Sequence, residues 1–199
     1  MLFRSELVDG DEILAIAAVD LLKSGRLAEQ TLVATVMSNF GLDEALGSMG
    51  GKVIRAKVGD RYVIEEMVER NLNLGGEQSG HMIFRDFTTT GDGIISALQV
   101  LQIMQSSGKP LSELKQCLKK YPQAQRNLKV KEKRPLEELP AVMKLVGDAE
   151  KELSGKGRVL LRYSGTEPKI RLLIEGRELE QIDRQANRIA EAIQSAIGV

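Results

Sequence analysis

Apolar residues in the first part of the chain recur alternately with the spacing of helices and the spacing of strands. The apolar positions within residues 13–22 fall on one helical face that ends before Gly25, and the β-branched run at residues 32–36 is typical of a buried strand. Because strands and helices alternate along the chain, we expect an α/β layer over residues 1–118. The later elements predicted by the same reasoning are a short helix at 43–49, a strand at 52–57, a helix at 62–70, a longer helix that begins near residue 91, and a helix at 112–118.

The pattern changes around Pro122, where a proline stops the preceding helix and a polar stretch begins. Two later segments that alternate apolar and polar residues are joined by only five residues, which is typical of a hairpin. We therefore expect a second, small α+β domain over residues 119–199. Its predicted elements are one strand within 123–134, a helix at 142–153, strands at 158–163 and 169–175, and a closing amphipathic helix at 182–197.

Charge and cysteine content narrow the classes of function. Lysine plus arginine and aspartate plus glutamate both number 28 among 199 residues, so the chain lacks the basic excess of a general nucleic-acid binder. No apolar run is long enough to span a bilayer, so we expect no membrane partner. Cys117 is the only cysteine and allows no intramolecular disulfide. We expect a cytoplasmic protein whose partners are small molecules.

The loop between the two predicted hairpin strands has the chemistry of an anion cradle. Arg162 offers a planar fork of donors for phosphate oxygens, Ser164 and Thr166 add hydroxyls, and Gly165 allows successive backbone N–H groups to converge. Arg171, on the returning strand, can reach the same anion. The alternative is a polar hairpin loop with exposed arginines.

A second candidate site lies in the glycine-rich segment at residues 75–81. Here Glu77 can accept hydrogen bonds from two neighbouring sugar hydroxyls, and Ser79 can donate or accept beside it. His81, the only histidine, can move a proton near neutral pH. The alternative is a glycine-rich turn that carries an exposed histidine.

Taken together, Gly-Glu-Gln-Ser-Gly-His at 76–81 and Arg-Tyr-Ser-Gly-Thr-Glu-Pro at 162–168 resemble the α-D-phosphohexomutase family. The intervening segment 86–94 is also similar to that family, and Ala-Lys-Val-Gly-Asp-Arg-Tyr-Val at 56–63 resembles its amino-sugar branch. The resemblance covers the chain from end to end. It implies the third, α/β domain of such an enzyme, with a mixed sheet and helices, followed by the fourth, an α+β domain of the TBP-like type.

The same resemblance implies a role for each candidate residue. Glu77 and Ser79 are expected to bind sugar hydroxyls, and His81 to lie near the reacting phosphate, where it could transfer a proton. The residues expected to help recognise the amino sugar are Lys57, Asp60 and Arg61, and those expected to hold the non-transferred phosphate are Arg162, Ser164, Gly165, Thr166 and Arg171.

Two family motifs are absent from this sequence: the phosphoserine motif and the Asp-Gly-Asp-x-Asp-Arg metal loop. Asp9-Gly10-Asp11-Glu12 imitates the start of the metal loop, but an acidic first turn of the following helix explains it better. We therefore expect the C-terminal half of an enzyme, without a metal ligand or cofactor of its own and inactive alone. Its expected partners are the missing N-terminal domains.

The complete enzyme is expected to interconvert glucosamine 6-phosphate and glucosamine 1-phosphate for the synthesis of UDP-N-acetylglucosamine and cell-wall precursors. The resemblance implies that it uses Mg²⁺ and a hexose bisphosphate activator. Two alternatives stay open at this point. One is an enzyme of the phosphomannomutase or phosphoglucomutase branch, and the other is a stand-alone module that binds sugar phosphates without catalysis.

Overall fold

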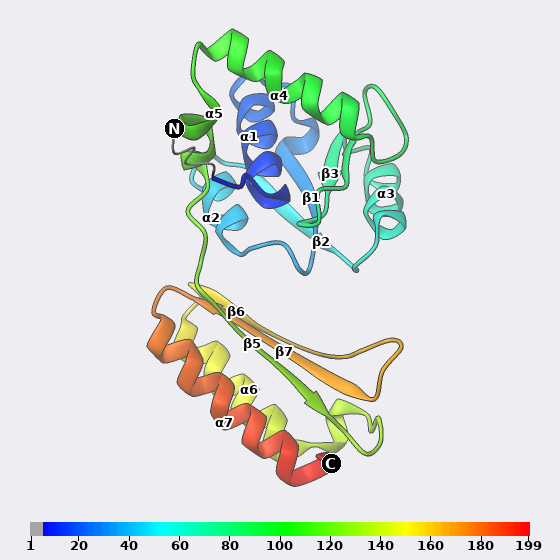
Figure 1. Ribbon diagram of the computed structural model, residues 1–199, viewed down its shortest axis with the longest axis vertical. Helices are drawn as coiled ribbons and strands as arrows, with labels where there is room; N and C mark the ends of the chain where they lie inside the picture. The colour runs from blue at the N-terminus through cyan, green and yellow to red at the C-terminus, as the bar shows by residue number, and fades with distance from the viewer. Residues whose placement is uncertain (1–5) are drawn as a thin grey trace, which may run out of the picture. The chain divides into compact units, whose positions relative to one another are not determined.

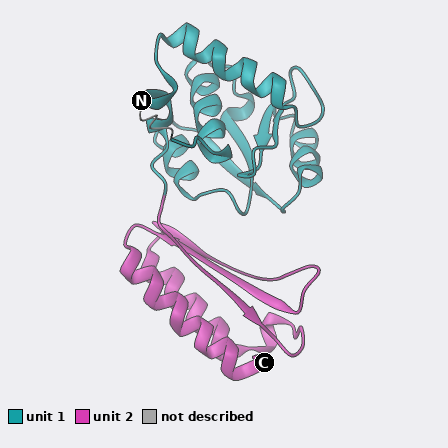
Figure 2. Cartoon of the chain, viewed as in Figure 1, with its two compact units in different colours: residues 1–120 teal, residues 121–199 magenta. Residues whose placement is uncertain are grey.

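The chain divides between Lys120 and Tyr121 into two compact units, here called unit 1 and unit 2 (Figure 2). The structure is a computed structural model and describes residues 6–199. Each unit has its own sheet and its own buried apolar clusters.

Unit 1 is built on a four-stranded mixed sheet with the order β2-β1-β3-β4. Strand β1 is parallel to both of its neighbours, and β4 runs antiparallel to β3. The strands are β1 (Thr31–Thr35), β2 (Lys52–Ala56), β3 (Leu74–Gly76) and β4 (Met82–Phe84), and the helices are α1 (Gly10–Lys23), the 3-10 turn η1 (Ala28–Gln30), α2 (Gly41–Gly47), α3 (Asp60–Glu69), α4 (Gly93–Ser107), α5 (Leu111–Leu114) and the 3-10 turn η2 (Lys115–Cys117).

Helices cover both faces of this sheet (Figure 1). Leu32 of β1 belongs to the cluster that contains Leu14 of α1, whereas its neighbour Val33 packs with Val63 and Met67 of α3. Successive strand residues point to opposite faces, so a central strand between two helical layers has to be apolar throughout. This requirement explains why all of β1 is buried.

Unit 2 is an antiparallel three-stranded sheet with the order β5-β7-β6. Figure 1 shows α6 and α7 side by side on one face of it. Ile170, Leu172 and Ile174 alternate along β7 and are buried in the cluster that contains the apolar face of α7. The elements are β5 (Gln123–Lys129), the 3-10 turn η3 (Leu136–Glu138), α6 (Pro140–Leu153), β6 (Gly157–Tyr163), β7 (Lys169–Gly176) and α7 (Leu179–Ile197).

The expected fold class, a mixed α/β sheet followed by an antiparallel sheet with helices, is confirmed. The one strand expected within residues 123–134 is β5, which ends at Lys129. Two details of the prediction are wrong. Strands β3 and β4 flank the Glu77 turn, where no strand was predicted, and the helix predicted at 112–118 is a single turn of α-helix followed by a 3-10 turn. Among residues 6–199, no helix combines the length and the apolar character that crossing a bilayer requires.

Candidate functional site

Glu77 stands at the start of the five-residue connection between β3 and β4. Its backbone N–H donates to the carbonyl of His81 at 2.9 Å, and the Gly80 N–H donates back to the Glu77 carbonyl at 3.0 Å. Gly80 has a φ of +102°, which favours glycine. The connection is therefore a closed turn that presents the Glu77 side chain in a fixed direction.

The Glu77 carboxylate bridges this turn to a distant part of the chain. Its Oε1 accepts a hydrogen bond of 2.9 Å from the N–H of Gly59, and its side chain is only 12% exposed. Gly59 has a φ of +126° and precedes α3. Segment 57–61, which the family resemblance implies to help recognise the sugar, therefore contacts the Glu77 turn directly.

The charged residues of segment 57–61 have different surroundings. Lys57 is exposed, with its Nζ 5.7 Å from the centre of the Tyr62 ring. Asp60 is exposed and its carboxylate accepts from the Arg61 N–H at 2.7 Å. Arg61 is paired with Glu65 one turn along α3, at 2.8 Å. Of these three residues, Arg61 is engaged along the helix rather than with Glu77.

His81 and Ser79 form the exposed rim of the same turn. The Ser79 Oγ lies 3.3 Å from the Nδ1 of His81, and that nitrogen lies 3.7 Å from the Glu77 Oε2. The His81 side chain is 65% exposed, so it can meet a ligand from solvent. A carboxylate, a hydroxyl and an imidazole thus gather in one place and can bind hydroxyl groups or share a proton.

The candidate phosphate site in unit 2 brings two positive side chains together. Arg162 on β6 and Arg171 on β7 are direct partners across the sheet. Partial burial and the charge of Arg171 hold the pKa of Arg162 below its usual value. Like charges opposite one another on paired strands are destabilising, and a bound anion would relieve that repulsion.

Several polar groups of the loop between these strands already form hydrogen bonds with other groups of this chain. Ser164 is buried, and its hydroxyl accepts a 3.4 Å hydrogen bond from the Glu167 N–H. Lys133 donates to the carbonyls of Ser164 and Gly165, at 2.6 and 3.4 Å. Gly165 and Thr166 are exposed. Gly165 has no positive φ, so the conformational freedom assigned to it from the sequence is not used here.

Glu167, within the same loop, was not singled out from the sequence. Its carboxylate lies 2.6 Å from the Lys169 Nζ and 3.5 Å from Arg171. These two cations lower the pKa of Glu167, with Lys169 contributing most. An incoming phosphate would therefore compete with the Glu167 carboxylate for Arg171.

The acidic residues at the start of α1 have different structural roles. Asp9 caps α1, and Asp9 and Glu12 exchange hydrogen bonds of 2.9 and 3.2 Å in a capping box. Lys120 adds ion pairs to both carboxylates. The interpretation of Asp9 as part of a helix start is confirmed.

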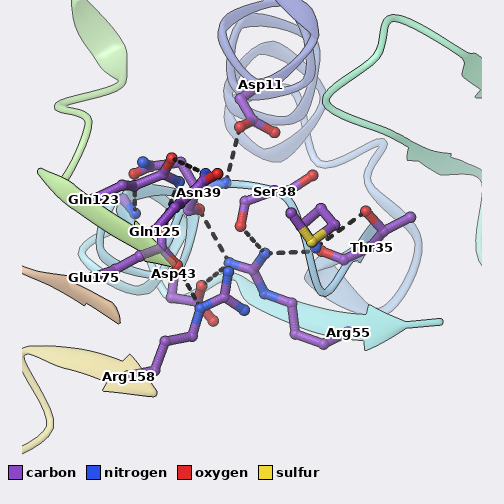
Figure 3. Close-up of polar contacts among 12 residues, drawn as sticks. Asp11, Thr35, Ser38, Asn39, Asp43, Arg55, Gln123, Gln125, Arg158 and Glu175 are labelled. Atoms are coloured by element: carbon purple, nitrogen blue, oxygen red, sulfur yellow. Dashed lines mark hydrogen bonds and ion pairs between the residues drawn. The ribbon is translucent and has the colours of Figure 1, made fainter. Parts of the chain in front are cut away.

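Asp11, by contrast, is fully buried, and it accepts a 2.8 Å hydrogen bond from the Asn39 N–H (Figure 3). Burial raises the pKa of Asp11, while the Asn39 N–H and the Ser38 side chain act against the rise. Arg55 holds the same segment from β2 by donating to the Thr35, Ser38 and Asn39 carbonyls and pairing with Asp43. Nothing in the spacing of these residues indicated the network.

The residues at the start of α1 do not fit a magnesium site. Asp9 and Glu12 are committed to the capping box and to Lys120, and Asp11 faces the protein interior. Within residues 6–199, no three His, Cys, Asp or Glu side chains gather in a group that could hold a metal ion. The only cysteine, Cys117, is a half-buried thiol whose pKa burial raises to about 11.

Comparison with known proteins identifies two consecutive domains of one family. The profile described as "Phosphoglucomutase/phosphomannomutase, alpha/beta/alpha domain III" matches residues 9–121. The profile described as "Phosphoglucomutase/phosphomannomutase, C-terminal domain" matches residues 126–192.

Individual relatives agree with this result. The phosphoglucosamine mutase of Geotalea daltonii is 55% identical over 191 residues, and that of Anaeromyxobacter sp. strain Fw109-5 is 52% identical over 195 residues. The alignments cover 96% and 98% of this chain but 42% of each relative, so the chain spans less than half the length of these proteins.

Solved structures support the fold. A structure of N-acetylphosphoglucosamine mutase from Aspergillus fumigatus superposes with a TM-score of 0.80 at 19% identity, over 98% of this chain and 44% of the other. A second structure of that enzyme, in complex with GlcNAc-6P and magnesium, has a TM-score of 0.75 at 21% identity and covers 94% of this chain and 47% of the other. The chain therefore belongs to the phosphoglucomutase/phosphomannomutase family, of which it contains the alpha/beta/alpha domain III and the C-terminal domain.

Proposed function

We propose that this chain is the sugar- and phosphate-binding part of a phosphoglucosamine mutase, an isomerase that interconverts glucosamine 6-phosphate and glucosamine 1-phosphate. The observation that carries the proposal is the hydrogen bond from the Gly59 N–H to the Glu77 carboxylate. It joins a turn suited to sugar hydroxyls to a segment that resembles the amino-sugar branch of the family. The relatives at 52–55% identity are phosphoglucosamine mutases, which supports the same substrate.

In unit 1, Glu77 and Ser79 bind neighbouring hydroxyls of the sugar ring, and His81 contacts the reacting phosphate or shares a proton with it. Lys57 and Asp60 are exposed beside this turn and contribute to recognition of the amino sugar. Arg61, also exposed, lies at the edge of this sugar site. The Glu77 carboxylate keeps Oε2 for the ligand while Oε1 remains on Gly59.

In unit 2, Arg162 and Arg171 hold the phosphate that is not transferred, together with the Thr166 hydroxyl and the backbone of Gly165. The Ser164 hydroxyl accepts from the Glu167 N–H and donates its own hydrogen to a phosphate oxygen. Phosphoryl transfer depends on positioning and on neutralisation of charge, so a site that grips only a phosphate serves both orientations of the sugar.

The nucleophile and the metal are supplied elsewhere in this proposal. The sequence contains no phosphoserine motif and no Asp-Gly-Asp-x-Asp-Arg loop, and the described carboxylates fit no metal site. The 199-residue chain is therefore inactive alone, and the complete cytoplasmic enzyme uses Mg²⁺ and a hexose bisphosphate with residues that precede this region in the relatives.

A titration of the 199-residue chain with inorganic phosphate, followed by NMR, tests the phosphate site. Charge-assisted hydrogen bonds from arginine contribute about 1.5–3 kcal/mol, so Arg162→Ala should weaken phosphate binding roughly tenfold or more. Glu167→Gln should strengthen it, because the competing carboxylate is lost. Arg184→Ala, which removes an exposed arginine of α7, is the charge-matched control. Equal affinity for the wild type and Arg162→Ala would reduce the loop to a hairpin connection.

The sugar assignment is tested on the same chain with glucosamine 6-phosphate and mannose 6-phosphate. Both ligands should shift amides around Arg162, because both carry the phosphate. Both sugars should shift the amides at residues 77–81, where Glu77 and Ser79 bind ring hydroxyls, but only the amino sugar should strongly shift the amides at residues 57–61. Asp60→Asn should remove that difference at residues 57–61. Identical shifts for the two sugars would exclude the proposed specificity.

A further inference from the structure

We infer that Gly10, the first residue of α1, is a positioning residue for the Glu77 turn, and that the absence of a side chain at Gly10 sets where the Glu77 carboxylate lies. The inference rests on the proposed function, because it assigns a role in sugar binding to a residue outside the binding turn.

The evidence is the close approach of two backbone segments. A Cβ atom on Gly10 would lie 2.4 Å from the carbonyl oxygen of Gln78 and 2.6 Å from that of Glu77. Ordinary contacts between non-bonded heavy atoms begin at about 3.5 Å, so any side chain at residue 10 requires a displacement of about 1 Å. Both obstructing atoms belong to the backbone, so a change of rotamer cannot relieve the clash.

The start of α1 is fixed more firmly than the turn it supports. Asp9 and Glu12 close the capping box, and Lys120 pairs with both of them. One residue further, Asp11 accepts from the Asn39 N–H, and Leu14 on the next turn is fully buried. A clash at Gly10 would therefore move the exposed turn rather than the helix.

A displaced turn carries the candidate ligand groups with it. The carbonyl of Glu77 that faces Gly10 also accepts from the Gly80 N–H, which closes the turn. The carboxylate of the same residue meets the Gly59 N–H at 2.9 Å. A shift of about 1 Å breaks a hydrogen bond of this length, and misplacement of a binding group by that distance can reduce function by about 100-fold.

The test compares Gly10→Ala with Gly47→Ala in the 199-residue chain. Gly47 lies in α2, and a Cβ there would meet no atom within 4 Å, so its substitution is the matched control. In Gly10→Ala we expect hydrogen exchange of the Gly59 amide to rise about tenfold or more and glucosamine 6-phosphate to bind at least about fivefold more weakly. Inorganic phosphate should bind with unchanged affinity, because its site is in unit 2. Gly47→Ala should match the wild type in all three measurements.

The outcomes separate this inference from the proposed function. If the wild type binds no sugar phosphate, the proposed function fails, while exchange of the Gly59 amide still decides whether Gly10 positions the turn. Normal protection of that amide in folded Gly10→Ala overturns the inference. If Gly10→Ala does not fold, Asp9→Ala replaces it, since loss of the cap loosens the helix start without adding a clash. Faster exchange at Gly59 in Asp9→Ala then supports the inference, and unchanged exchange contradicts it.

Discussion

At the scale of single residues, Asp9 and Asp11 show what a sequence motif does and does not reveal. Both are acidic residues at a helix start, and for Asp9 the expected cap is present. Asp11 faces inward, where its Oδ1 has no hydrogen-bond partner among the described residues and its other oxygen accepts from Asn39. The direction of a side chain at a helix start depends on which loops pack there, and those contacts come from distant segments.

The buried carboxylate of Asp11 leads to a prediction about pH. Because burial raises its pKa in the folded protein above the unfolded value of about 3.9, the folded state holds this proton more tightly. In the wild type, the protonated Asp11 carboxyl therefore stabilises the folded state at low pH. This stabilisation is lost as the pH rises from about 3.9 through the folded pKa, and it amounts to about 1.4 kcal/mol for each unit by which the two pKa values differ. Asp11→Asn has no carboxyl group that titrates at this position, so it does not show this loss of stability.

Urea unfolding of the wild type and Asp11→Asn between pH 3.5 and 7.5 measures this effect. The free energy of unfolding of Asp11→Asn, relative to the wild type, should increase with pH and then level off. Asp60→Asn, at an exposed position, controls for the loss of one negative charge. A relative stability that falls with pH would mean that favourable hydrogen bonds, not burial, dominate at Asp11.

At the scale of elements, long periodic segments were predictable and short ones were not. The helical faces of α1, α6 and α7 follow from apolar spacing over fourteen or more residues. Strands β3 and β4 have three residues each, and two of the three in β3 are glycines that carry no apolar signal. The sequence therefore predicts no strand on either side of the Glu77 turn, although the turn connects two.

The contact between the Glu77 carboxylate and Gly59 could not be predicted from spacing either. The two residues are 18 positions apart and meet because α3 crosses over from β2 to β3. Only the family resemblance placed segment 57–61 near the sugar. The arginine pair of unit 2 was easier to foresee, because residues that flank a short hairpin are opposite one another by geometry.

The glycines of β3 support a prediction at this scale. Gly75 and Gly76 lie within β3, where the absence of side chains allows close packing. A Cβ on Gly75 would lie 2.6 Å from the Met67 Sδ and 2.8 Å from the Val63 Cγ1, both on α3. Gly75→Ala should therefore destabilise unit 1 by about 1–3 kcal/mol through overpacking.

Chemical denaturation of Gly75→Ala, with Gly47→Ala as the control at an open helix position, measures this cost. The added methyl group of Gly75→Ala crowds the contact between β3 and α3 and does not directly contact the Glu77 turn. Stability equal to that of the wild type would show that α3 shifts freely on the sheet.

At the scale of the whole molecule, the cores of the two units are separate clusters. Leu14 lies in a cluster formed entirely by residues of unit 1, and Ile174 lies in one formed entirely by residues of unit 2. The boundary between Lys120 and Tyr121 lies within one residue of the end of the first matched family domain, at residue 121, and precedes the second, which begins at residue 126. Domains that each bury their own core unfold as separate cooperative units, so the chain is expected to show two transitions.

We predict that core truncations act only on their own unit. Leu14 and Ile174 are both fully buried, so Leu14→Ala should lower the stability of unit 1, and Ile174→Ala that of unit 2, by about 2–5 kcal/mol each. Leu98→Ala is the control, because Leu98 is 58% exposed on α4 and should cost far less. Residue-resolved hydrogen exchange in increasing urea reports the opening free energy of each unit separately.

Limited proteolysis should cut the wild type first near residues 119–123 and leave two resistant pieces. If either core substitution lowers the opening free energies of both units equally, the chain unfolds as one cooperative body, and the anion site of unit 2 then depends on the core that supports the Glu77 turn.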